Sequence, residues 1–167
     1  SGVILIAKRA PILRELHRQL REKHIEKRYL ALVCGKWPRA VRVVDAPLEK
    51  NALQSGERMV RVSRDGKRAV TEFSVVERLA GATLIEARPI TGRTHQIRVH
   101  AQQAGFPLLG DDKYSDDRTA AFARQIGLKR LFLHAASLQF SLLDKGDFTL
   151  RAPLENNLDI ILEKLRK

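Results

Sequence analysis

The sequence has 167 residues, of which 44% are hydrophobic, so the chain can bury a core as one domain and differs from a disordered protein. Lys and Arg number 31 against 19 Asp and Glu, and the net charge of +12 favours a polyanionic partner, with nucleic acid first. The alternative is a generic basic surface that serves solubility. One cysteine, Cys34, cannot build a disulfide framework or a cysteine-based zinc site, and no apolar run reaches the ~20 residues of a membrane span. These properties favour a cytoplasmic protein over a membrane protein.

The first predicted elements are a strand, a helix and a second strand. The β-branched apolar run over residues 3–7 predicts a buried strand. Because a buried strand seldom comes first without a partner, we expect the chain to be the later part of a longer polypeptide. A helix is predicted over residues 11–23. It is followed by a strand over 27–35, whose alternation places Tyr29, Ala31 and Val33 on one face. The apolar face of the helix would consist of Leu13, Leu16 and Leu20.

An antiparallel meander is predicted for the middle of the chain. Asp65–Gly66 is a strong hairpin signal, and Ala80–Gly81 is a second tight connection. Residues 51–57 are polar and predict a mobile loop. The strands joined by these turns would cover residues 59–63, 67–79 and 82–90.

The C-terminal third predicts two further strands and two helices. The expected ranges are a helix over 119–126, strands over 131–142 and 148–152, and a helix over 154–166. The last helix can bury Leu158, Ile161, Leu162 and Leu165. The whole pattern predicts an α+β fold with a mostly antiparallel sheet and helices packed against it.

A strand-to-helix corner over residues 89–100 concentrates charge. Gly92 breaks the strand, Thr94 is the expected N-cap, and the helix ends near residue 104. Backbone N–H groups point outward at such a corner, which makes it a good place to hold an anion. The corner carries two arginines and two histidines, Arg93, His95, Arg98 and His100. The side chains expected to pack on the core are Ile97, Ala101 and Ala104.

The histidines of this corner and the aspartates that follow it could also serve other chemistries. His95 and His100 are five positions apart, which is not the spacing of a helical metal pair, and no metal site is expected. A ribonuclease-like arrangement of histidines remains an open enzyme alternative because His134 is also present. Asp111 and Asp112 lie in a turn, where aspartates usually cap backbone N–H groups.

Five segments occur in the order seen in RluA-type pseudouridine synthases, and the sequence resembles the bacterial RluC branch most. These segments are SGVILIAK (1–8), KRYLA (27–31), PITGRTHQIRVH (89–100), GDDKY (110–114) and LFLHA (131–135). The resemblance implies the pseudouridine synthase fold, an α+β mixed sheet with a central RNA-binding cleft. It also implies isomerisation of uridine to pseudouridine in large-subunit (23S) ribosomal RNA by a cytoplasmic monomer that flips the base and uses neither a cofactor nor a metal.

The resemblance also assigns residues. Tyr29 matches the tyrosine that stacks on the target uracil, and Arg98 matches the basic residue that pairs with the catalytic aspartate. Arg93, His95 and Arg28 are expected to contact RNA.

The nucleophilic aspartate of the family belongs to a His-Arg-Leu-Asp segment followed by Thr-Ser-Gly, and this chain begins at that Ser-Gly. We therefore expect the nucleophile and the N-terminal RNA-binding domain to lie outside these 167 residues, and Arg98 to have no aspartate of this chain as its partner. The alternative is a non-catalytic basic RNA-binding domain, which would not need Tyr29 and Arg98 to meet in one cleft.

Overall fold

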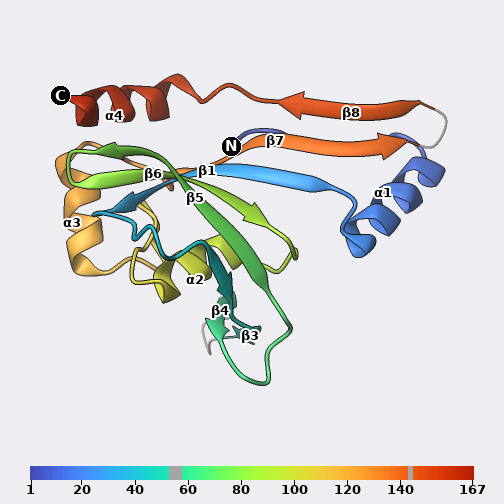
Figure 1. Cartoon of the computed structure of the whole chain (residues 1–167), viewed down its shortest axis with the longest axis horizontal. Helices are drawn as coiled ribbons and strands as arrows, with labels where there is room; N and C mark the ends of the chain where they lie inside the picture. The colour runs from blue at the N-terminus through green and yellow to red at the C-terminus, as the bar shows by residue number, and fades with distance from the viewer. Residues whose placement is uncertain (53–57, 143–144) are drawn as a thin grey trace.

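A six-stranded sheet in the order β2-β5-β6-β1-β7-β8 forms the centre of the computed structural model, which describes residues 1–52, 58–142 and 145–167 (Figure 1). All neighbouring strands in this sheet pair antiparallel. Its strands are β1 (Glu26–Cys34), β2 (Val43–Asp45), β5 (Val70–Leu79), β6 (Ala82–Pro89), β7 (Leu133–Leu142) and β8 (Gly146–Arg151). A second, two-stranded sheet consists of β3 (Leu48–Ala52) and β4 (Arg58–Val62).

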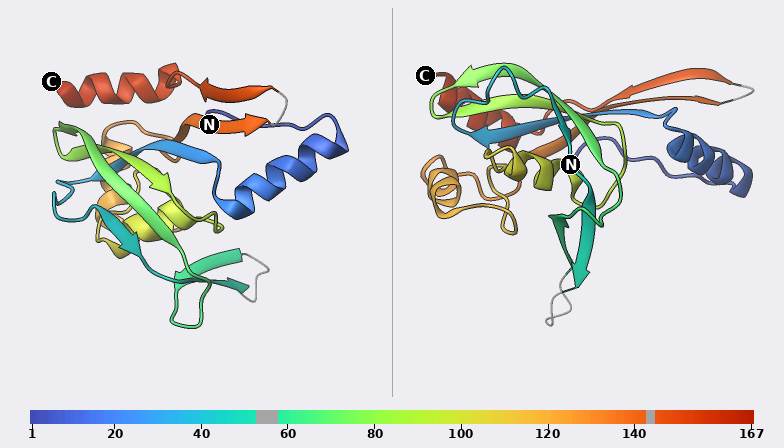
Figure 2. Two further views of the ribbon diagram at one scale, coloured as in Figure 1. Left: turned by 45° about the vertical axis from the view of Figure 1, so that its right-hand side comes forward. Right: turned by 60° about the horizontal axis from the view of Figure 1, so that its bottom comes forward.

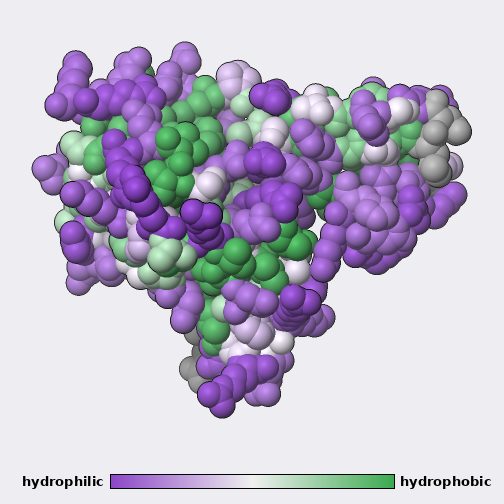
Figure 3. Space-filling model, in the orientation of Figure 1, coloured by the Kyte–Doolittle hydropathy of each residue, from purple (hydrophilic) through white to green (hydrophobic). Residues whose placement is uncertain are grey.

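Helices lie on both faces of the sheet and beside its long β7–β8 arm, as the two views of Figure 2 show. Their bounds are α1 (Ala10–Glu22), α2 (Gln96–Gln103), α3 (Asp117–Gln125) and α4 (Asn156–Arg166). The α+β class and the mostly antiparallel sheet predicted from the sequence are therefore confirmed. Hydrophilic residues dominate the face drawn in Figure 3, including the side of α1 seen at its right. No helix within the described ranges has the length and apolar composition that crossing a membrane requires.

The alternation of β1 divides the core into two layers. Tyr29, Ala31 and Val33 face α2 and pack with Ile85 and Ile97. Their neighbours on the other face pack with α3 and α4, and the four apolar residues predicted for α4 are all buried there. The α2-facing layer is the one that supports the corner over residues 89–100.

The N-terminal predictions are wrong in two respects. Residues 3–7 form no strand: Gly2 makes one isolated bridge to Ala135, and the side chains of Ile4 and Ile6 are 78% and 79% exposed. The start of the run lies against β7, where Val3 N donates to Ala135 O over 2.9 Å, but within the described residues the pairing does not continue along the run, so its pattern alone does not produce a strand. On α1, the predicted apolar residues Leu13 and Leu20 are also largely exposed, with relative accessibilities of 44% and 46%.

The side of α1 that is buried is set by the β7–β8 arm. Leu16 packs beside Ile25 and Phe140, and the buried Gln19 donates a hydrogen bond to the carbonyl of Ser141. A polar residue thus occupies a position facing the arm, where its amide group binds the backbone of β7.

The hairpin predicted between residues 59–63 and 67–79 is wrong, because β4 and β5 belong to different sheets. A tight turn does form, with Gly66 N donating to Ser63 O over 2.9 Å, but Lys67 then pairs with Leu48 rather than with β4. Of the predicted mobile loop over 51–57, the first two residues lie in β3, while 53–57 lie outside the described residues.

The later connections follow the sequence more closely. The tight turn at Ala80–Gly81 joins β5 to β6, and Gly81 has φ +73°, a conformation that favours glycine. The four C-terminal elements are confirmed with small shifts in their bounds. The sequence also predicts a turn over residues 144–147; position 144 lies outside the described residues, and Gly146 and Asp147 belong to β8.

Candidate active site

The corner between β6 and α2 is fastened by a buried amide. Gln96 is 4% exposed, and its Oε1 accepts hydrogen bonds from Thr91 Oγ1 (2.7 Å) and from Arg93 N (2.9 Å). Its Nε2 donates to Val70 O over 2.9 Å and to Thr71 Oγ1 over 3.0 Å. Both ends of the amide are therefore satisfied, which holds the corner rigidly on the sheet. The sequence alone indicates no role for Gln96.

The start of α2 differs from the prediction. Thr94 is exposed and is not the N-cap; the N-cap residue is His95, with φ +53° and no side-chain cap hydrogen bond. The backbone N–H of Gln96 donates to Arg93 O over 3.2 Å, and the left-handed conformation of His95 falls where a Thr94 cap would place the first helical residue, so the helix begins one residue later. The predicted core face of α2 is confirmed, since Ile97 and Ala101 are buried.

A cavity of about 350 Å³ opens between this corner, β1 and β7. No Asp or Glu from the described part of the chain lines it. Tyr29 and Arg98, which the family resemblance assigns to one site, both border this space, and burial raises the pKa of Tyr29 above its usual value. The residues that give the cavity its character are Lys27, Tyr29, Arg93, His95, Arg98 and Leu133.

Tyr29 reaches the cavity from an irregular position of β1. The pairing of β1 with β7 shifts register between Arg28 and Tyr29. Such bulges re-aim side chains and occur often beside active sites. Tyr29 lies opposite Ala87 on β6, whose small side chain leaves room on that face.

Arg98 has a carboxylate partner in this chain, contrary to our expectation. Its Nε and Nη2 donate to the two oxygens of Asp111 over 2.7 Å and 2.6 Å, and the Asp111 side chain is fully buried, with 0% exposure. Asp111 also accepts backbone hydrogen bonds from Lys113 and Tyr114, which confirms its expected role as a turn cap. Burial alone would raise the pKa of Asp111, but the bonds from Arg98 and the backbone lower it overall.

The third guanidinium nitrogen of Arg98, Nη1, does not bind Asp111. Nη1 forms no hydrogen bond with the described residues, while the guanidinium lies 4.8 Å from the centre of the Tyr114 ring. Arg98 therefore borders the cavity as a fixed cation that keeps one nitrogen for another partner.

His95, at the start of α2, contacts the buried Tyr114. His95 Nδ1 lies 2.8 Å from Tyr114 Oη, and their rings meet edge to face at 5.6 Å. Tyr114 is 3% exposed, and in the sequence it is recognisable only as part of the motif over residues 110–114. Its position after Gly110 and Asp111 was the one signal that pointed to it.

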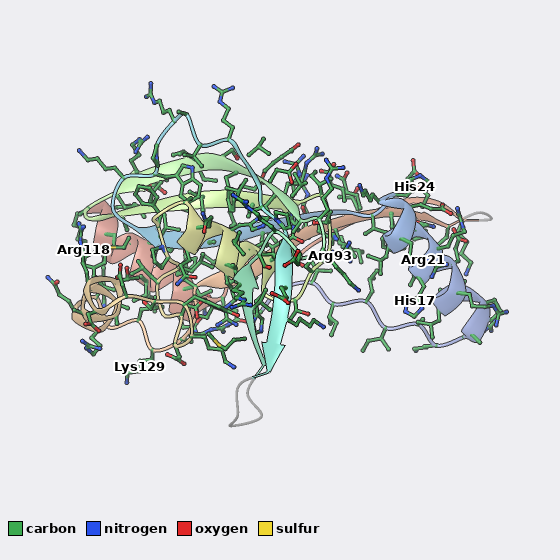
Figure 4. All side chains as sticks on the ribbon, turned by 90° about the horizontal axis from the view of Figure 1, so that it is seen from below. His17, Arg21, His24, Arg93, Arg118 and Lys129 are labelled. Carbon is green, nitrogen blue, oxygen red and sulfur yellow. The ribbon has the colours of Figure 1, made fainter. Side chains whose placement is uncertain are left out.

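The other two residues expected to contact RNA lie apart from each other. Arg93 is exposed at the cavity and donates to Arg68 O over 3.2 Å; Figure 4 shows it between the labelled residues of α1 and those near α3. Arg28 points to the opposite face of the sheet from Tyr29, where it pairs with Glu26 and Glu86, each at 2.7 Å. The structure therefore brings Arg93, but not Arg28, to the site.

The histidines do not converge as a ribonuclease-like site would require. His100 is fully buried between Thr71 Oγ1 and Ala46 O, and His134 is bonded to Ser1 Oγ and Ala152 O. Neither lines the cavity with His95. In the described residues, no group of three or more His, Cys, Asp or Glu side chains is placed to hold a metal ion.

Comparison with known proteins gives a consistent result. Residues 1–103 match the family model described as RNA pseudouridylate synthase. The chain is 54% identical to ribosomal large subunit pseudouridine synthase C of Haemophilus ducreyi over 99% of its length, and 54% identical to that of Escherichia coli K12. It spans about half the length of these curated relatives, 52% and 53% respectively.

Solved structures agree in fold. The human RNA pseudouridylate synthase domain containing 4 superimposes with a TM-score of 0.75 at 27% identity, over 95% of this chain and 69% of that one. The human domain containing 1 gives a TM-score of 0.77 at 23% identity, over 93% of this chain and 66% of that one, and supports the fold alone. The ordered motifs, the sheet and these matches lead to one conclusion: the chain belongs to the RNA pseudouridylate synthase family.

Proposed function

We propose that this chain is the C-terminal portion of the catalytic domain of a pseudouridine synthase that acts on 23S ribosomal RNA in the cytoplasm. Membership of the family and the names of the relatives support the reaction and the class of RNA. The net charge of +12 suits a polyanionic substrate. The observation that carries the proposal is the convergence of Tyr29 and Arg98 on one cavity, lined by cations and by no acid of the described chain.

In the proposed reaction, a flipped uridine enters the cavity and its base stacks on Tyr29. The C1′–N1 bond breaks, the uracil turns, a C1′–C5 bond forms, and the hydrogen on C5 leaves to water while N1 gains a proton. The reaction is an isomerisation without net oxidation or reduction, and the family resemblance implies that it uses no cofactor. Arg93 lies where it can bind a neighbouring phosphate.

The catalytic carboxylate of this proposal comes from the His-Arg-Leu-Asp segment that precedes Ser-Gly in the family. The described geometry leaves room for that partner, because Asp111 occupies Nε and Nη2 of Arg98 and leaves Nη1. A carboxylate on Nη1 would remain ionised and oriented at neutral pH. Arg98 would thus join two acids, one that fixes it and one that reacts.

The test uses the natural polypeptide that contains these residues and an RNA labelled with tritium at C5 of uridine. Formation of the C1′–C5 bond releases the tritium, so its appearance in water measures turnover. Arg98→Lys keeps a cation beside Asp111 but loses the fork, and should reduce turnover about 100-fold with little change in RNA affinity. Arg166→Lys, at an exposed pair with Glu77, is the control and should leave turnover unchanged.

Two results would decide against the proposal. No tritium release by the unmodified polypeptide on ribosomal RNA would favour the non-catalytic RNA-binding alternative. Equal losses of affinity and turnover in Arg98→Lys would instead make Arg98 a phosphate contact.

A further inference from the structure

His95 has a backbone conformation that a non-glycine residue rarely adopts. Its φ is +53°, and in the described chain the only other non-glycine residue with positive φ is Lys23, at the C-terminal end of α1. The left-handed conformation is unfavourable for such a residue, because its Cβ lies too close to the following carbonyl oxygen. Strain of this kind persists where the surrounding contacts hold it, and it is frequent at functional sites.

The contact that holds His95 also decides which ring nitrogen carries its proton. Tyr114 Oη accepts a hydrogen bond from Val60 N over 3.0 Å. Its own hydroxyl proton then has one partner within the described residues, the Nδ1 of His95 at 2.8 Å. Since Tyr114 is 3% exposed, a hydroxyl pointing elsewhere would be left unsatisfied in the interior.

When Nδ1 accepts this hydrogen bond, the proton of the neutral imidazole resides on Nε2. Nε2 has no hydrogen-bond partner among the described residues, and His95 is part of the cavity wall. The ring is therefore anchored at its buried nitrogen and has an unused N–H at the other.

We propose that Tyr114 is a positioning residue that fixes His95 as an uncharged Nε2–H donor, and that this donor binds an acceptor oxygen of the RNA in the cavity. The proposal rests on the proposed function for the nature of the ligand. The tautomer itself is independent of that function. The acceptor is either a carbonyl oxygen of the base or a phosphate oxygen.

The charged surroundings of His95 agree with an uncharged ring. Burial lowers its pKa most, and the nearby cations Arg98, Lys113 and Lys50 lower it further, whereas Asp111 acts in the opposite direction. Because the pKa is below the usual value of about 6.5, the neutral form dominates at pH 7 and above. Protonation would also place a second proton donor opposite the Tyr114 hydroxyl.

The first test is a long-range ¹H–¹⁵N NMR spectrum of the chain at pH 7.5, which distinguishes the two neutral tautomers and the imidazolium by their ¹⁵N shifts. We expect the Nε2–H tautomer for His95, and Tyr114→Phe should shift the ring toward a tautomer mixture. An Nδ1–H tautomer or an imidazolium at this pH in the unmodified chain would overturn the proposal, whatever the enzymatic activity proves to be.

The second test measures the affinity for a fluorescein-labelled single-stranded oligouridylate. His95→Ala should raise Kd about three- to tenfold, whereas His95→Gln, whose amide can place an N–H near Nε2, should stay within about twofold of the unmodified chain. The salt dependence of log Kd should not change in His95→Ala, because an uncharged donor releases no counterion. A shallower salt dependence, or no recovery in His95→Gln, would contradict the proposal.

An abasic oligomer with the same number of phosphates identifies the acceptor. If His95→Ala weakens binding of both oligomers equally, the acceptor is a phosphate oxygen. If only the oligouridylate is affected, it is a carbonyl oxygen of the base. Either result supports the donor role, and no effect on either oligomer would refute it.

Discussion

The buried pair of Arg98 and Asp111 gives the sharpest prediction about stability. In Asp111→Asn the side chain keeps its size, and its remaining oxygen can still accept the backbone N–H groups of Lys113 and Tyr114. The new amide nitrogen, however, replaces Oδ2 and donates rather than accepts, so that it opposes the Nε–H of Arg98. The substitution thus removes the charge partner and leaves the turn cap in place.

The size of the effect follows from burial. The Asp111 side chain has 0% exposure and that of Arg98 14%, so the guanidinium would lose its partner in a largely dry site. Removal of one member of a buried pair costs about 3–5 kcal/mol. We expect a loss near the lower limit, about 3 kcal/mol, because Arg98 borders the cavity and can gain some water there.

Urea unfolding of the chain followed by circular dichroism measures this loss. Glu77→Gln is the matched control, since Glu77 pairs with Arg166 at the surface with side-chain exposures of 34% and 45%. That control should cost less than about 1 kcal/mol. A loss in Asp111→Asn no larger than in the control would refute the argument that the pair is a buried, fixed element of the site.

The pH dependence provides an internal check. The pKa of Asp111 is lowered in the folded chain, so its contribution is present above the unfolded pKa of about 3.9 and is lost as the pH falls through the folded value. The difference between the unmodified chain and Asp111→Asn should therefore be constant near neutral pH and shrink on acidification below about pH 4. A difference that persists unchanged through this range would contradict the assignment.

Two further predictions concern the scaffold and the RNA surface. Gly110→Ala should destabilise the chain by more than about 2 kcal/mol in urea unfolding, because a Cβ there would lie 2.0 Å from the carbonyl oxygen of Arg130 at φ +74°; Gly105→Ala, with φ +85° and nothing within 4 Å, should lose only about 1 kcal/mol, and equal losses would refute the steric argument. Arg93→Ala should weaken binding of single-stranded RNA and reduce the salt slope by about 1, whereas Arg28→Ala should change neither, as measured by fluorescence anisotropy; the reverse order would place the RNA on the opposite face of the sheet.

The sequence predicted correctly those strands and helices in which buried apolar residues recur with the period of the element. The alternation of Tyr29, Ala31 and Val33 assigned these residues to one face, and the spacing of the apolar residues in α4 identified its buried side. In both cases a packed neighbour covers the apolar positions, so the periodicity reports the environment directly.

Which strands pair with each other could not be predicted from local patterns. The turn at Asp65–Gly66 forms, but a turn signal does not say that the strands around it bond to each other, and β4 pairs with β3 instead of β5. Residues 3–7 have the composition of a strand, but in the described chain their pairing with β7 stops after Val3 bonds to Ala135. Both errors arise because pairing depends on tertiary neighbours and not on local propensity.

The sequence predicted which residues line the candidate site better than it predicted which contacts those residues make. Tyr29 and Arg98 do meet in one cavity, but the Arg98–Asp111 pair was missed because the resemblance directed attention to a different carboxylate. The position of Arg28 could have been predicted, since neighbouring residues of a strand point to opposite faces and Tyr29 already faced the cleft. Tyr114 had no local signal beyond its motif.

The most direct measurement is the pseudouridine content of 23S ribosomal RNA in cells that lack the natural polypeptide containing these residues. Mapping by mass spectrometry after cyanoethylation distinguishes pseudouridine from uridine, which has the same mass. We predict that specific positions revert to uridine and that the unmodified gene restores pseudouridine there. The Arg98→Lys variant should accumulate as a folded protein but should not restore pseudouridine at these positions. Unchanged pseudouridine in the deletion, or full restoration by Arg98→Lys, would contradict the assignment of this cavity as the active site.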